Sequence, residues 1–119
     1  MNADEFRKRT KRFAIRVIQF VEGLPNSGAS YVIGGQLVRA GTSVGANYRS
    51  ACRARSRADF IAKLKIVEEE CDESLYWLEL FDEMRHKNRL PVADLMKEAD
   101  ELLSMVVASI KTARFPRGF

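Results

Sequence analysis

The sequence is poor in residues that interrupt regular structure and in residues that commonly bind metals or cross-link chains. Its 119 residues include only 3 Pro, 7 Gly, 2 Cys and 1 His. So few Pro and Gly exclude a collagen-like or low-complexity chain. The cysteines, Cys52 and Cys71, lack the spacing of a metal site, and His86 is the single histidine.

Long apolar runs are also missing. No run approaches the roughly 18 residues that a membrane span requires, and the N-terminal stretch MNADEFRKRTKRF is charged where a signal peptide would be apolar. We therefore expect a cytoplasmic protein that does not enter membranes and keeps both thiols free. With 46% hydrophobic and 30% charged residues, the composition is that of an ordinary globular chain, expected to form one domain over residues 1–119.

Charge is unevenly distributed along the chain. Residues 1–65 contain 13 Lys and Arg against 4 Asp and Glu, whereas residues 66–110 contain 4 Lys and Arg against 12 Asp and Glu. Two interpretations remain open. Basic helices could lie beside acidic ones and pair with them, or the basic half could present a face to nucleic acid or to an acidic partner.

Apolar residues recur at three- and four-residue steps, which is typical of amphipathic helices. The pattern predicts helices over about residues 4–22, 30–53, 56–86 and 92–113, followed by a flexible basic tail at 114–119. Asp4 and Ser56 are the expected N-caps of the first and third helices. Four helices with short connections predict an all-α protein, folded as an antiparallel up-and-down four-helix bundle.

Three glycines, Gly34, Gly41 and Gly45, share one face of the second predicted helix, beside its apolar stripe. Each glycine destabilises a helix by about 1 kcal/mol relative to alanine. Their common face predicts that another backbone approaches closely there. A break or bend near residues 41–45 is the competing explanation.

The third predicted helix carries two apolar stripes. One contains Phe60, Leu64, Val67, Cys71, Leu75 and Leu78, and the other, about 100° away, contains Ile66, Trp77, Leu80, Phe81 and Met84. A bundle core needs only one stripe from each helix. The second therefore predicts an oligomer interface, made by Ile66, Trp77, Leu80 and Met84.

Polar residues flank these stripes and predict a network between the second and third helices. Glu70 and Glu73 fall within the second apolar stripe, where a carboxylate needs a partner. Arg39, Ser43 and Asn47 follow one another at four-residue steps on the second helix. We expect Arg39 to pair with a carboxylate, with Ser43 and Asn47 adding hydrogen bonds that fix helix register or an interface. The alternative is that all five residues are separately solvated.

The run RSACRARSR concentrates positive charge at the turn between the second and third helices. The guanidinium group matches the geometry of phosphate, and few aromatic residues lie nearby for base stacking. The pattern predicts binding to nucleic-acid backbones with little sequence selectivity, assisted by the basic first helix. The alternative is pairing with acids of a neighbouring helix. The predicted contact residues are Arg49, Arg53, Arg55, Arg57 and Lys63.

Nothing in the sequence predicts catalysis. The acidic cluster at residues 68–73 lacks the Glu-x-x-His pairs of bundle metal sites, and the stretch GGQLVRAG lacks the lysine and preceding strand of a phosphate loop. We expect no metal, no cofactor and no enzymatic activity.

Residues 37–80 resemble the core of the four-helix bundle family that includes the 23S rRNA-intervening sequence proteins. The matching pieces are Arg39-Ala40, Ser43, Asn47, the Arg-x-x-Ser turn at Arg53–Ser56, Phe60, and Glu73 with Trp77-Leu78-Glu79. After the asparagine that matches Asn47, many members of that family continue with Ile-Ala-Glu-Gly, whereas this chain has Tyr48-Arg49-Ser50-Ala51 and is more basic.

The resemblance implies a left-handed antiparallel bundle that assembles into a ring-like homopentamer. It is similar to the accessory variability determinant proteins of diversity-generating retroelements, whose basic barrels bind nucleic acid and a reverse transcriptase. The implied partners are therefore further copies of the chain, RNA or DNA, and a reverse transcriptase or another protein. No catalytic residue is implied.

Together these observations predict a non-enzymatic, oligomeric four-helix bundle protein that binds nucleic acid through an arginine patch. The alternative is a protein–protein adaptor or scaffold whose charges serve self-assembly only.

Overall fold

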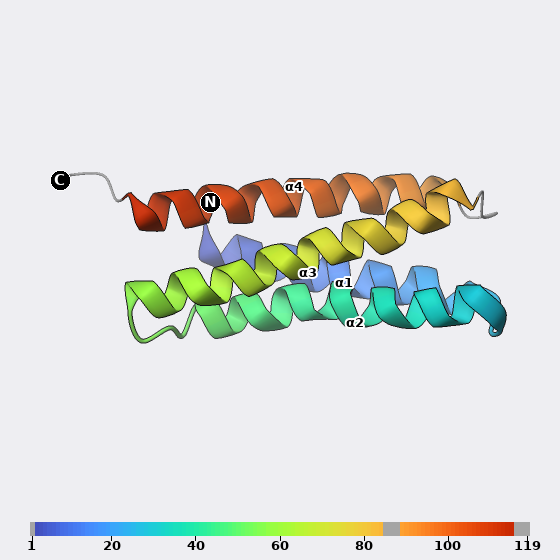
Figure 1. Cartoon of the computed structure of the whole chain (residues 1–119), viewed down its shortest axis with the longest axis horizontal. Coiled ribbons are helices and arrows are strands. Elements are labelled where there is room, and N and C mark those ends of the chain that lie inside the picture. Colours follow the sequence, from blue (N-terminus) through green and yellow to red (C-terminus); the bar gives the residue numbers. More distant parts are fainter. Residues whose placement is uncertain (1, 85–88, 116–119) are drawn as a thin grey trace.

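The computed structural model describes residues 2–84 and 89–115, and it consists of four long helices (Figure 1). They are α1 (Ala3–Glu22), α2 (Gly28–Ala51), α3 (Arg57–Glu83) and α4 (Arg89–Arg114). Successive helices run in opposite directions along a body of 53 × 21 × 20 Å. The predicted all-α four-helix fold is therefore confirmed. None of the helices described is long and apolar enough to cross a membrane.

The helix ends differ from the predicted ends by up to three residues. α2 begins at Gly28 instead of 30 and ends at Ala51 instead of 53. Gly28 itself adopts a φ of 69°, a left-handed conformation that favours glycine. α3 begins at Arg57 and ends at Glu83, whereas α4 begins at Arg89 instead of 92. Pro91 consequently falls in the first turn of α4, where its missing N–H is tolerated. His86 and tail residues 116–119 lie outside the described residues.

Polar caps explain where two helices begin. The N-cap of α1 is Asn2, not Asp4 as predicted, because the Asn2 Oδ1 accepts hydrogen bonds from the N–H groups of Asp4 (2.8 Å) and Glu5 (3.2 Å). Ser56 caps α3 as expected, since its Oγ accepts from the Asp59 N–H at 3.0 Å. The Asp59 Oδ2 in turn accepts a hydrogen bond from the backbone N–H of Arg55 at 3.1 Å.

The core runs along the whole bundle. α3 contributes Leu64, Val67, Cys71, Ser74, Leu78 and Phe81. The other helices contribute Phe6, Thr10, Phe13, Val17 and Phe20 from α1, Leu37, Ala40, Val44, Tyr48 and Ala51 from α2, and Val92, Leu95, Ala99, Leu102, Val106 and Ile110 from α4.

The predicted stripes of α3 differ from the structure at three residues. Phe81 belongs to the core, where its ring meets that of Phe20 edge-on at 5.5 Å, and not to the second stripe of α3. Phe60 and Leu75, predicted in the core, are only half-buried at its margin. The buried residues of α3 follow alternating steps of three and four, so the true stripe has a period near 3.5 residues. Such a stripe drifts around the helix and takes up Ser74 and Phe81.

α1 packs closely against the glycine face of α2, the face that carries Gly34, Gly41 and Gly45. A Cβ built on Gly41 would lie 3.1 Å from both Val17 Cγ atoms, and one on Gly45 would lie 3.1 Å from Thr10 Oγ1. α2 itself is continuous from Gly28 to Ala51. α1 thus lies close to this face, through the side chain of Val17 at Gly41 and through the side chain and backbone carbon of Thr10, 3.6 Å from the added Cβ, at Gly45. No break interrupts the helix at residues 41–45.

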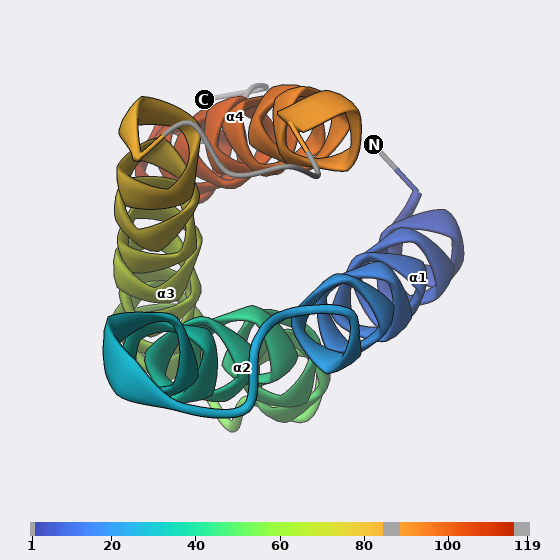
Figure 2. The same ribbon diagram turned by 90° about the vertical axis from the view of Figure 1, so that its right-hand side faces the viewer.

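A charged seam joins α1 to α4, the pair of neighbouring helices with the least extensive contact (Figure 2). The Arg9 guanidinium donates two hydrogen bonds to Glu98, each 2.8 Å long, and lies 3.5 Å from Glu101. The hydrogen bonds from Arg9 lower the pKa of the Glu98 carboxyl. Helical periodicity assigned no role to Arg9, because the periodicity of a single helix does not identify the partner across a seam.

The glycine face leads to a prediction about stability. Gly35 lies in the same helix, but a Cβ added there would meet nothing within 4 Å. Gly35→Ala should therefore raise the free energy of unfolding by up to about 1 kcal/mol. Gly41→Ala should instead lower it by about 1 kcal/mol or more, because the stiff, buried Val17 has no room to retreat. Urea denaturation at one protein concentration compares the two, and equal gains would contradict the close packing.

The seam leads to a prediction about pH. Because the pKa of Glu98 is lowered by folding, its pairing with Arg9 stabilises the protein above the pKa of an unfolded glutamate, and this contribution is lost as the pH falls through the folded pKa. Glu98→Gln should cost about 1 to 2 kcal/mol at pH 7 and progressively less below about pH 4. Glu101→Gln is the control, with a smaller effect because its side chain is 51% exposed. A deficit that persists undiminished in acid would contradict this assignment.

Candidate functional site

Basic side chains gather where α2 ends and α3 begins. Arg49 in the last turn of α2 and Arg53 in the turn just after that helix are exposed, and so are Arg55 in the same turn and Arg57 at the start of α3. Lys63 is half-buried on α3. The structure brings three of the five predicted contact residues into one hollow of about 560 Å³, which is lined by Ala46, Arg49, Ser50, Arg53 and Lys63. Arg55 and Arg57 extend the charged surface outside this hollow.

These arginines have little internal compensation. Within residues 2–84 and 89–115, no ion pair involves Arg49, Arg53, Arg55 or Arg57. Lys63 does pair with Asp59 at 3.1 Å, and the Arg55 N–H together with Lys63 lowers the pKa of the Asp59 carboxyl. In the part of the chain that is described, none of these five residues pairs with an acid of a neighbouring helix, and the Lys63–Asp59 contact lies within α3 itself.

Three residues of the acidic cluster of α3 lie on a different side of that helix from the basic hollow. Glu68, Glu69 and Asp72 line a hollow together with Lys65, Leu103 and Val107 of the α3–α4 face. The basic hollow lies instead between α2 and α3. This separation explains why the opposite charges of the two halves of the sequence do not simply cancel.

Arg39 holds α2 and α3 together on their outer face. Its guanidinium lies 3.2 Å from Glu70 Oε2 and also contacts the Glu73 carboxylate, and the Trp77 Nε1–H donates to that same carboxylate at 3.2 Å. Ser43 and Asn47 do not join this group, because their side chains donate to carbonyls of their own helix, at Arg39 (2.7 Å) and Ser43 (2.8 Å). Among the described residues, the ion pairs between α2 and α3 are those that Arg39 makes with Glu70 and Glu73.

Apolar side chains remain uncovered beside this link. Ile66 is 43% and Met84 48% exposed, and Tyr76 is 51% exposed with its ring edge-on to Trp77. Trp77 and Leu80 are half-buried, and Trp77 packs against the margin of the core. The outer face of α3 thus combines exposed hydrophobic residues with a satisfied polar group, as protein interfaces do.

The two thiols differ in environment. Cys71 lies in the core, where burial, assisted by the nearby carboxylates of α3, raises the pKa of its thiol to about 12. Cys52 is exposed at the end of α2. Across the described residues, no three His, Cys, Asp or Glu side chains come together as metal ligands would.

Comparison with known proteins identifies the family. Residues 4–108 match the family of the 23S rRNA-intervening sequence protein, so the chain belongs to that family. Its structure is similar to the crystal structure of a protein of unknown function from the S23 ribosomal protein family of Bacteroides thetaiotaomicron, with a TM-score of 0.83 and 36% sequence identity. That similarity covers 90% of this chain and 99% of the other. A search among curated proteins found no match. Neither description mentions a catalytic activity.

Proposed function

We propose that this protein is a non-enzymatic, self-associating scaffold of the cytoplasm that binds the backbone of RNA or DNA. The observation that carries the proposal is the exposed group Arg49, Arg53, Arg55 and Arg57, which forms no ion pair with any described acid. An uncompensated cluster of guanidinium groups attracts phosphates and releases their counterions on binding. The charge and exposure of these four side chains support this role.

The surroundings of the patch favour contact with the backbone over contact with bases. Tyr48 is buried, with its ring edge-on to Phe6 at 4.5 Å, and Phe60 is half-buried. The Tyr48 ring is therefore not available for stacking, and Phe60, packed against the core, is only partly accessible. Binding should therefore depend little on nucleotide sequence.

We further propose that copies of the chain associate through the outer face of α3, forming a ring that the family resemblance suggests is a pentamer. The exposed apolar surface consists of Ile66, Tyr76 and Met84, and the ion-paired side chains of Arg39 and Glu70 lie next to it. A ring repeats the arginine patch in every subunit and so strengthens weak phosphate contacts through multivalency. The same apolar face favours one alternative, an adaptor that docks another protein such as a reverse transcriptase.

Assembly is tested by the mass of the protein in solution. Light scattering coupled to size-exclusion chromatography should report an oligomer at micromolar concentration. Ile66→Asp should shift the protein toward a monomer, because it places a charge on the proposed interface. Ile15→Asp is the matched control, since Ile15 is 47% exposed on α1, away from α3, and should leave the mass unchanged. A monomeric wild type would contradict self-association.

Nucleic-acid binding is tested by a salt titration. Affinity for a duplex should fall with salt, by about 0.9 in log–log slope for each phosphate contact. Arg53→Gln with Arg57→Gln should flatten this slope while the oligomer stays intact. Lys97→Gln with Lys111→Gln removes the same charge from exposed positions on α4 and should leave the slope unchanged. Equal slopes for the wild type and the arginine variant would exclude this patch, and absence of binding at low salt would favour the adaptor.

A further inference from the structure

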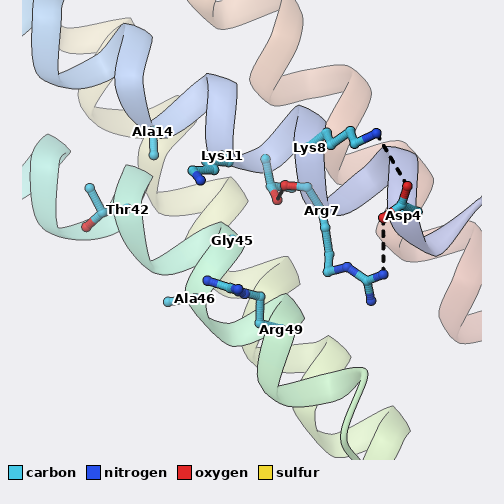
Figure 3. Close-up of a pocket in the computed structure, with 10 residues that line it drawn as sticks. Asp4, Arg7, Lys8, Lys11, Ala14, Thr42, Gly45, Ala46 and Arg49 are labelled. Atoms are coloured by element: carbon cyan, nitrogen blue, oxygen red, sulfur yellow. Dashed lines mark hydrogen bonds and ion pairs between the residues drawn. The ribbon is translucent and has the colours of Figure 1, made fainter.

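A second basic hollow lies between the first half of α1 and the second half of α2 (Figure 3). It encloses about 370 Å³. Arg7, Lys8 and Lys11 line it from α1, and Arg49 lines it from α2. Small residues, Ala14, Gly45 and Ala46 among them, complete its lining, so the charged side chains stand around a space that no large side chain fills.

The charge in this second hollow, called the α1–α2 cleft below, is unbalanced. Four cationic side chains line it against one carboxylate, that of Asp4. Asp4 lies 3.3 Å from the Arg7 Nη2 and 3.4 Å from the Lys8 Nζ. Lys11 and Arg49 form no ion pair within the described part of the chain. The cleft therefore keeps an excess of positive charge that an anion can neutralise.

Arg49 connects this cleft to the patch already described. It lines the α1–α2 cleft and also the hollow that contains Arg53 and Lys63. A basic strip thus crosses three helices, from α1 over α2 to α3. An isolated phosphate would occupy one of the two hollows, whereas a chain of phosphates could occupy both in succession.

We propose that the α1–α2 cleft holds a phosphate group of the nucleic-acid backbone, and that Asp4 competes with this phosphate for Arg7 and Lys8. The inference rests on the proposed backbone binding, and it adds the α1 residues and a built-in competitor to that site. The chemistry recognised is that of a phosphodiester, which accepts paired hydrogen bonds from a guanidinium group.

Asp4 suits the role of a competitor because its ion pairs are exposed. Its side chain is 64% exposed, and those of Arg7 and Lys8 are 40% and 75% exposed. Exposed pairs of this kind contribute little to stability, so a phosphate can displace the carboxylate at small cost. Asp4 is ionised at neutral pH as any ordinary aspartate is, and the hydrogen bond from Arg7, with the charge of Lys8, lowers its pKa further.

The test measures the binding of a fluorescent single-stranded oligonucleotide by anisotropy at low salt. Asp4→Asn should tighten binding about two- to fivefold, because it frees Arg7 and Lys8. Glu5→Gln is the matched control: it changes the net charge equally one residue away, and Glu5 has no ion pair within the described residues. Equal effects of the two substitutions would overturn the role of Asp4.

A second pair of variants tests the cleft itself. Lys11→Gln should weaken binding and reduce the salt slope, whereas Arg12→Gln should do neither, because Arg12 does not line the cleft and acts electrostatically on Glu98. An unchanged affinity in Lys11→Gln, with the salt slope still flattened in the Arg53/Arg57 variant, would overturn this inference and leave the proposed function standing. A wild type that binds no oligonucleotide would overturn both.

The source of the phosphate is distinguished by competition. Inorganic phosphate should displace the oligonucleotide no better than chloride at the same ionic strength if the cleft recognises a polymer that spans both hollows. Displacement by phosphate at concentrations where chloride has no effect would overturn the assignment to a backbone and identify a small phosphate compound as the ligand.

Discussion

The close contact between α1 and the glycine face of α2 is the constraint on which the rest of the structure depends. Because Gly41 and Gly45 have no Cβ, Val17 and Thr10 lie directly against the backbone of α2. This contact fixes the distance and the register of the two helices. The same register places the basic first turns of α1 beside Arg49, so one packing feature builds part of the core and the cleft on its outer side.

Positive charge has two distinct roles in this fold. Arg9 and Arg39 face carboxylates on neighbouring helices and hold α1 to α4 and α2 to α3. The arginines at the end of α2 and the start of α3 face solvent instead. A guanidinium that is already paired inside the bundle is a poor ligand for an outside phosphate, whereas an unpaired one keeps its hydrogen-bond donors available. The asymmetry of charge along the sequence is therefore partly structural and partly available for binding.

Helical periodicity was sufficient to predict the four helices and most of their buried residues, because a helix must bury one apolar face whatever its neighbours are. It was less accurate over the length of α3. A straight stripe of period 3.6 included Phe60 and Leu75 and missed Ser74 and Phe81, whereas helices that coil around one another follow a period nearer 3.5. Asn2 was missed as a cap because the choice between neighbouring polar residues depends on which backbone N–H groups each one reaches.

The sequence by itself determined the class of fold, the faces of the helices and the sites where charge accumulates, since these follow from the order of residues along single helices. The pairing of Arg39 with Glu70 could also be predicted from the sequence, because Glu70 falls within an apolar stripe, where a carboxylate needs a partner, and Arg39 lies beside the apolar stripe of the neighbouring helix. Only the tertiary structure decided which charges meet. Arg7 and Arg49 are more than forty positions apart in the sequence, and they share a cleft because glycines let α1 and α2 approach. Periodicity gives the direction of a side chain from its own helix axis, whereas a binding site depends on the distance between two axes.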